Sequence, residues 1–257
     1  GASGIQVYAV AGEMDPANLK ATGRKELLKF IKSNGLVVSA VCGDLGGHGF
    51  AIRDDNEWKI RKSKEILDLA NDLEANVVTT HIGVLPEDLN QEKVNVMAEA
   101  CYELGKYAET RGSYFAIETG PEKAVVLKTF LHNLGTKGIA VNYDPANLVM
   151  VTGDDPVEGV HTLGKYIVHT HAKDGKMVKR EDPAVVYGWF AEGGIEDLRL
   201  SDYFIETPLG EGDVDFPAYL KALDAVGYEG YFTIEREVGE NPEADIRKAV
   251  QFLKELL

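Results

Sequence analysis

The sequence predicts an α/β protein of the TIM-barrel type, and two patterns indicate this fold class. Short apolar, β-rich runs alternate with helical patterns along the 257 residues, which is typical of parallel strands joined by right-handed crossovers. Four of the later strands each end in an ionisable residue, and barrel active sites are built from the carboxyl ends of several strands. An open doubly wound sheet would more often gather its site at one switch point, and the chain lacks the GxGxxG opening of a dinucleotide-binding unit.

Seven strands are expected from the apolar and β-branched runs along the chain. They are Ile5–Val10, Leu36–Val41, Val77–Ile82, Tyr114–Glu118, Ile139–Asp144, Ile167–His171 and Tyr231–Glu235. Helical patterns lie between them, at about 21–33, 57–74, 91–110, 123–134, 156–164, 216–226 and 242–256. Pro156 and Pro242 each follow an Asp or Asn, which is typical of a helix start.

A barrel of this type has eight strands, so the count of seven needs an explanation. The opening "GASGIQVYAV" is typical of a second βα unit, and we expect the chain to lack, or depart from, the first βα unit. The alternative is a further strand within residues 173–214, a segment too long for a plain loop. We interpret that segment as a partly ordered lid or oligomer contact, inserted in a single barrel domain over residues 1–257.

Composition excludes several classes of partner. The chain has 27 Lys and Arg against 42 Asp and Glu, a net charge of −15 that repels nucleic acid and anionic lipid. No apolar run is long enough to cross a membrane, and the first residues lack the basic region of a signal peptide. Two cysteines, Cys42 and Cys101, favour reduced, buried thiols and a cytoplasmic location.

The strand-end residues Glu118, Asp144, His171 and Glu235 form the candidate site. Each acid follows apolar or small residues, and a buried carboxylate is costly unless it is paired or bound to a cation. Three carboxylates that converge would repel one another, and a divalent cation removes that conflict. With one imidazole this is a mostly hard ligand set, which favours Mn²⁺ or Mg²⁺, with Co²⁺ and Zn²⁺ as further options.

These motifs resemble the sugar phosphate isomerase/epimerase family, a group of xylose-isomerase-like barrels that includes ketose 3-epimerases and inosose dehydratases. The matching pieces are "AIETG", "NYDPANL", "HTHAKDG", "PLGEGDVDFPAYLKAL" and "GYEGYFTIERE". The resemblance implies that Glu118, Asp144, His171 and Glu235 bind one metal ion, and that Glu118 and Glu235 are the acid/base pair. It also implies proton abstraction alpha to a carbonyl, through an enediolate, from a small sugar or sugar phosphate.

Three positions depart from the epimerase pattern and leave the substrate open. Asn147, Met177 and Ala124 stand where the epimerases tend to have a histidine, an arginine and a glutamate. An anionic group such as a phosphate could instead contact Lys173 or Lys176. We predict Asn147, Lys173, His81, His48 and His169 as substrate-binding residues, although a hydrogen-bonded core histidine is the more usual interpretation of His169 and a packed supporting residue fits His81 equally well.

Four functions compete at this point. The first is the metal-dependent isomerase or epimerase, and the second is an inosose-type dehydratase, a lyase that would use the same proton abstraction. The third is an abasic-site endonuclease, which the acidic charge and the six histidines disfavour. The fourth is a carbohydrate-binding barrel without catalysis. A homo-oligomer is also expected, because an exposed barrel edge and the 173–214 segment both need cover.

Overall fold

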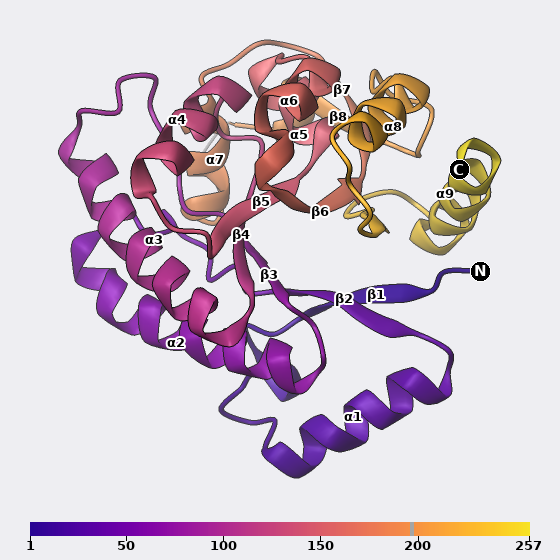
Figure 1. Ribbon diagram of the computed structural model, residues 1–257. Helices are drawn as coiled ribbons and strands as arrows, with labels where there is room; N and C mark the ends of the chain where they lie inside the picture. The colour runs from indigo at the N-terminus through magenta and orange to yellow at the C-terminus, as the bar shows by residue number, and fades with distance from the viewer. Residues whose placement is uncertain (196–197) are drawn as a thin grey trace. The chain divides into compact units, whose positions relative to one another are not determined.

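The computed structural model describes residues 1–195 and 198–257, and within them seven strands form one sheet (Figure 1). The strand order is β1–β2–β3–β4–β5–β6–β9. The bounds are β1 Gly4–Tyr8, β2 Val37–Cys42, β3 Val77–Thr80, β4 Tyr114–Glu118, β5 Ile139–Tyr143, β6 Ile167–Ala172 and β9 Phe232–Ile234. The seven strands expected from the sequence are thereby confirmed.

The expected helices are also found in the described part of the chain. They are α1 Ala21–Ser33, α2 Arg53–Asp72, α3 Glu92–Arg111, α4 Ala124–Leu134, α6 Pro156–Leu163, α8 Phe216–Ala225 and α9 Pro242–Leu256. Shorter helical turns join them: η1 Gly12–Met14, α5 Pro145–Asn147, η2 Leu148–Thr152 and η3 Gly164–Tyr166. The starts of α6 and α9 are capped by the side chains of Asp155 and Asn241, which accept backbone N–H groups of the first turn. None of the helices described has the length and apolar character that a membrane crossing requires.

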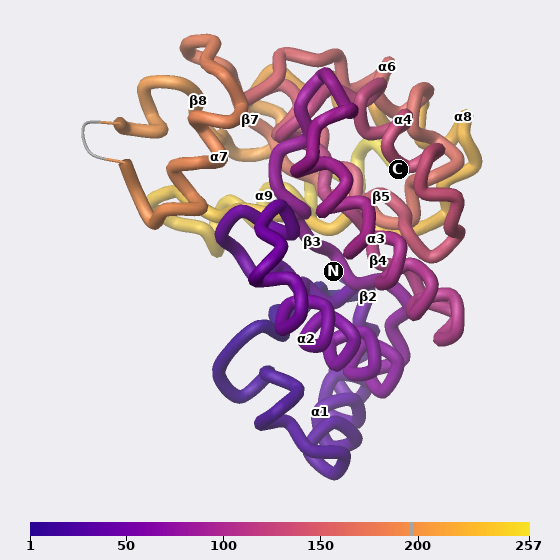
Figure 2. The backbone as a smooth tube through the Cα atoms, turned by 90° about the vertical axis from the view of Figure 1, so that its left-hand side faces the viewer, coloured from indigo at the N-terminus to yellow at the C-terminus, as the bar shows by residue number. Residues whose placement is uncertain are grey.

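The first of two compact units comprises Gly1–Gly83, Asp88–Glu118 and Phe130–Asn142. Its strands pair in parallel from β1 through to β5. The helices α2 and α3 pack side by side (Figure 1 and Figure 2). The strands β2 to β5 are largely buried and mostly apolar, as parallel strands covered on both faces usually are, whereas β1 is only partly buried. The fully buried strand residues include Ala40, Val41, Val78, Phe115 and Ile117.

A glycine-rich loop after β2 is anchored to the end of β3. The Phe50 N–H donates to the Ile82 carbonyl at 2.9 Å, and Gly49 has a φ of +58°. A Cβ at Gly49 would overlap the backbone of Ile82, so only glycine fits this close approach. The buried Lys59 ammonium donates to the carbonyls of Gly46 at 3.0 Å and Gly49 at 2.6 Å. The loop is therefore held in place by the helix that follows it.

The second unit comprises Val84–Glu87, Thr119–Thr129 and Tyr143–Leu257. In it β6 pairs in parallel with β9. The rings of Tyr143 and Tyr219 stack with centroids 5.8 Å apart, and both side chains are fully buried. These aromatic side chains make up part of the core between the sheet and α8.

The 173–214 segment contains a hairpin rather than a further barrel strand in its described part. The strands β7 Asp174–Met177 and β8 Phe204–Thr207 pair antiparallel in a separate two-stranded sheet. Between them lie α7 Pro183–Ala191 and the turn η4 Leu200–Asp202 (Figure 2). The role of the segment as a lid or oligomer contact stays a prediction.

One buried carboxylate ties this hairpin to the loop before α8. Asp174 accepts N–H groups from Gly175, Gly210 and Gly212, each at 2.9 Å, and from Val214 at 3.2 Å. Burial raises the pKa of Asp174, although the four N–H donors oppose that change. The "LGEGDVD" motif is thus organised around one side chain.

We expect Gly212→Ala to destabilise the protein, because a Cβ at this position would overlap the Asp174 carboxylate. Loss of the four hydrogen bonds should lower the free energy of unfolding by about 2 kcal/mol or more. Urea unfolding followed by circular dichroism measures the change. The matched control is Gly188→Ala in α7, where the nearest atom to a new Cβ lies 3.9 Å away. Equal stability of the two variants would contradict the role of Asp174.

Both thiols should be unreactive in the folded protein. Burial raises the pKa of Cys101 to about 12 and, with a smaller contribution from Glu118, that of Cys42 to about 11. Because the thiolate is the reactive form, Ellman's reagent at pH 8 should react at least about 100-fold more slowly with native than with unfolded protein. Rapid reaction of either thiol in the folded protein would show that the core around Cys42 or Cys101 opens to solvent.

Candidate metal centre

Asp144 is held rigidly where β5 passes into the short helix α5. Its carboxylate accepts the Asn147 N–H at 2.9 Å and so caps α5, and its side chain is fully buried. Its backbone N–H donates to the Thr119 hydroxyl at 2.7 Å, and that hydroxyl donates to the Asp144 carbonyl at 2.9 Å. The Asp-Pro sequence therefore serves both as a helix start and as the support of a buried acid.

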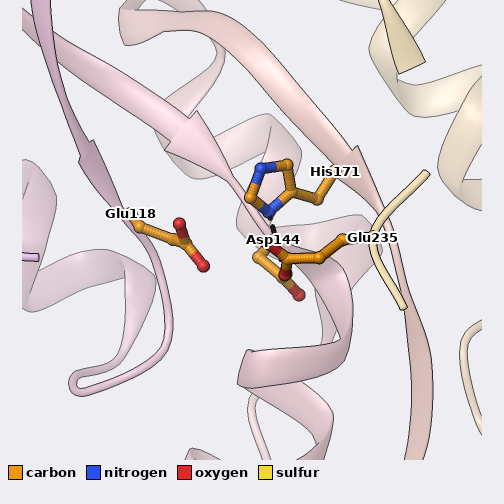
Figure 3. A group of neighbouring side chains, drawn as sticks. All are labelled: Glu118, Asp144, His171 and Glu235. Carbon is orange, nitrogen blue, oxygen red and sulfur yellow. Dashed lines mark hydrogen bonds and ion pairs between the residues drawn. The ribbon is translucent and has the colours of Figure 1, made fainter. Parts of the chain in front are cut away.

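His171 lies near the end of β6 with its ring fully buried. Its Nδ1 atom is 3.3 Å from Asp144 Oδ2 and 3.3 Å from Glu235 Oε2. One imidazole nitrogen thus faces two carboxylates. Figure 3 shows the ring of His171 and the carboxylates of Asp144 and Glu235 directed toward one another.

Glu235 follows the last residue of β9 and has a lysine as its second partner. The side chain of Lys173 is 4% exposed, and its ammonium lies 2.8 Å from Glu235 Oε2 and 2.6 Å from Glu237 Oε2. Burial alone would raise the pKa of Glu235, but His171 and Lys173 outweigh it and hold that pKa well below its usual value. Glu235 is therefore a carboxylate at neutral pH.

Glu118 ends β4 as a buried acid with amide and imidazole neighbours. Its Oε2 atom accepts an N–H from the Asn142 side chain at 3.0 Å, and its Oε1 atom lies 3.8 Å from His81 Nε2. The opposite ring nitrogen of His81 lies 2.8 Å from Asp44 Oδ2. Burial opposes ionisation of Asp44, yet the hydrogen bond and charge of His81 leave its pKa below the usual value.

Donor atoms of the four predicted ligands come together in the structure (Figure 3). One oxygen from each of Glu118, Asp144 and Glu235 and one nitrogen of His171 lie within 4.8 Å of one another. A group of this kind could hold a metal ion. The chemistry of the donors, three carboxylates with one imidazole, fits a hard divalent cation.

The other predicted site residues fall into different environments. His169 is buried and its Nε2 lies 2.9 Å from the Thr233 hydroxyl; burial and the neighbouring His171 lower its pKa to about 3. Asn147 is buried, and its side chain donates to the Thr119 carbonyl at 3.3 Å. His48 is exposed on the glycine-rich loop. Roles of these residues in substrate binding stay predictions.

Three supporting residues were not anticipated from the sequence. Thr119 braces Asp144, and Asp44 orients His81, as their hydrogen bonds show. Glu206 on β8 lies 3.8 Å from the Lys173 ammonium and is 5% exposed at its side chain. Asp44 lies two residues after the end of β2, so its place close to a strand end could have identified it in the same way as the predicted ligands. No local pattern singles out Glu206, because its partners are 30 or more residues away.

The comparison with known proteins gives a match over nearly the whole chain. The family model described as "Xylose isomerase-like TIM barrel" matches residues 1–256. The inosose dehydratase of Geobacillus thermodenitrificans is 27% identical over 175 residues, which are 64% of this chain and 55% of that protein. The chain thus spans about half the length of this curated relative.

Solved structures show the same fold. A xylose isomerase domain protein from Planctomyces limnophilus superposes with a TM-score of 0.80 and 24% identity, over 99% of this chain and 87% of that one. A xylose isomerase-like TIM barrel protein from Mycobacterium smegmatis, solved in complex with magnesium, gives a TM-score of 0.70 and 19% identity. That match covers 97% of this chain and 83% of the other.

We expect Lys173→Met to destabilise the protein by about 3 kcal/mol, because it leaves the carboxylates around the buried ammonium without their cation. The control is Lys179→Met, since the Lys179 side chain is 64% exposed and 4.0 Å from its acid partner. That change should alter stability by less than about 0.5 kcal/mol. Urea unfolding at pH 7 compares the two variants, and equal effects would contradict the structural role of Lys173.

Proposed function

The chain belongs to the xylose isomerase-like TIM barrel family, and from that premise we propose that it is a divalent-metal-dependent isomerase or epimerase. Its substrate would be a small sugar or sugar phosphate with a carbonyl group. The observation that carries the proposal is the convergence of donor atoms from Glu118, Asp144, His171 and Glu235. Mn²⁺ or Mg²⁺ suits this donor set best, and Co²⁺ or Zn²⁺ could replace them.

The residues of the centre would divide the work between binding and proton transfer. Asp144 and His171, both fully buried and fixed by hydrogen bonds, would serve only as ligands. Glu118 and Glu235 would also exchange protons with the substrate: one removes the proton alpha to the carbonyl, and the other returns a proton to the opposite face. A divalent cation, when bound, supplies positive charge that stabilises the developing enediolate.

Substrate recognition would depend on residues around the centre. The side chain of Asn147 already bonds the Thr119 carbonyl, and Met177 ends β7 without a charged group. Lys173 is surrounded by Glu206, Glu235 and Glu237, so its contact with an anionic substrate would compete with these partners. His81, oriented by Asp44 and close to Glu118, is the predicted substrate contact that the structure supports best.

A second candidate is a dehydratase of the inosose type. The inosose dehydratase relative, 27% identical over 175 residues, favours it. Proton abstraction would be the same, but the enolate would then expel a hydroxyl group from the neighbouring carbon as water. The metal ligands and the two glutamates would keep their roles, so the product distinguishes the two functions.

The metal-free protein should bind one Mn²⁺ or Mg²⁺ ion per chain, and Asp144→Asn should weaken that binding at least about 100-fold. The substitution removes a ligand charge but keeps an oxygen that can cap α5. Asp182→Asn is the matched control, because Asp182 caps α7 in the same way at an exposed position. Titration calorimetry measures both. Equal affinity of the two variants would contradict the proposed centre.

Activity is tested with metal-loaded protein on a panel of ketoses and inososes in D₂O. Deuterium at the carbon alpha to the carbonyl with inverted configuration identifies an epimerase, and loss of water identifies the dehydratase. Glu118→Gln should abolish both proton exchange and turnover. A protein that binds metal and exchanges no proton on any substrate of the panel would favour a carbohydrate-binding barrel instead.

A further inference from the structure

The acid Glu206, on strand β8 of the 173–214 hairpin, is directed at the segment that follows β9. Its Oε1 atom accepts an N–H from the Arg236 guanidinium at 2.7 Å and the backbone N–H of Glu237 at 3.1 Å. Only 5% of its side chain is exposed. A buried carboxylate with charged and backbone donors is a strong, geometrically defined anchor.

The segment that Glu206 anchors contains the proposed ligand Glu235. The strand β9 ends at Ile234, and the last sheet hydrogen bond runs from the Glu235 N–H to the Ala172 carbonyl at 3.2 Å. The chain beyond that bond leaves the sheet. The bond from the Glu237 N–H to Glu206 therefore holds the backbone on the far side of Glu235, and the Arg236 guanidinium adds a side-chain bond to the same acid.

The same acid also reaches the side chain of Glu235 through a lysine. The buried Lys173 ammonium lies 3.8 Å from Glu206 Oε2 and 2.8 Å from Glu235 Oε2. On the other side, Arg236 is braced by Asp245 of α9, with Nε 2.9 Å from Oδ2. Glu206 thus contacts two cationic side chains, Lys173 and Arg236. Lys173 pairs with Glu235, and Arg236 is the residue that follows Glu235 in the chain.

We propose that Glu206 is a positioning residue for Glu235, so that the hairpin forms a structural part of the metal centre. The inference rests on the proposed metal site and adds to it a residue outside the four proposed ligands. Residues that orient a metal ligand typically contribute about 10- to 100-fold to metal affinity. The hairpin would then set the affinity of the centre, whether or not it also covers the substrate.

The test compares Glu206→Ala with Glu237→Ala in the full chain, using Co²⁺ as the probe metal. Glu237 provides a matched control because it also contacts Lys173, at 2.6 Å, yet its side chain is 59% exposed and its carboxylate holds no backbone N–H in the described structure. Both variants remove one negative charge near Lys173. Calorimetry gives the Kd for Co²⁺, and visible absorption of the bound Co²⁺ reports its coordination.

Glu206→Ala should raise the Kd for Co²⁺ at least about tenfold and change the absorption spectrum, whereas Glu237→Ala should stay within about threefold of wild type. Equal changes in the two variants would overturn the inference, because charge alone would then explain them. An unchanged Kd and spectrum in Glu206→Ala would overturn it as well.

A milder variant covers the case in which Glu206→Ala does not fold. Glu206→Gln keeps an oxygen that can accept from Arg236 and Glu237, and should give a folded protein with a Kd between those of wild type and alanine variant. If Glu206→Ala does not fold and Glu206→Gln has the Kd and the spectrum of the wild-type protein, the inference is overturned. If the wild-type protein binds no Co²⁺, the proposed function itself fails. If wild type and all variants bind Co²⁺ equally, the metal site stands and only the role of Glu206 is overturned.

Discussion

The rest of the site depends on the cost of placing several carboxylates in a protein interior. Asp144 is fully buried, and the one imidazole nitrogen of His171 faces both it and Glu235 at 3.3 Å. A single imidazole cannot neutralise two carboxylates. The chain supplies a lysine to Glu235, whereas Asp144 has hydrogen bonds and the imidazole. The remaining negative charge is what a divalent cation would balance, so binding of a cation would lower the electrostatic cost of the fold.

The proposed ligands are held by elements just outside the strands that carry them. Asp144 is fixed because it also caps α5, and Thr119 locks its backbone from the end of β4. Glu235 is fixed on one side by the sheet and on the other by Glu206. Strand ends can therefore present polar side chains without the mobility usual for loops, and such preorganisation is what metal binding and proton transfer require.

The element positions and the four residues that converge could be predicted from the sequence because both have local signals. Apolar runs give the strands, and capped prolines give helix starts such as that of α6. The four proposed ligands stand out as ionisable residues at the ends of apolar strands. Glu206 could not be found in this way, because in "FIETPLG" it has the local pattern of a surface acid. Its hydrogen-bond partners, Arg236 and Glu237, are distant in the sequence. Lys173 was expected to contact an anionic substrate, and its three carboxylate neighbours depend on tertiary packing.

An isomerase and a dehydratase of this fold would share the first chemical step, so the ligands cannot distinguish them. The outcome is decided after the proton has left, by whether an acid lies close to a hydroxyl on the adjacent carbon. That choice belongs to residues outside the ligand set, at positions such as Asn147 and Met177, and to the hairpin that includes β7. If Glu206 couples the hairpin to Glu235, a change in the hairpin that alters substrate choice would also alter metal affinity. Specificity and metal binding would then be physically linked through the hairpin, because Glu206 ties β8 to the segment that follows Glu235.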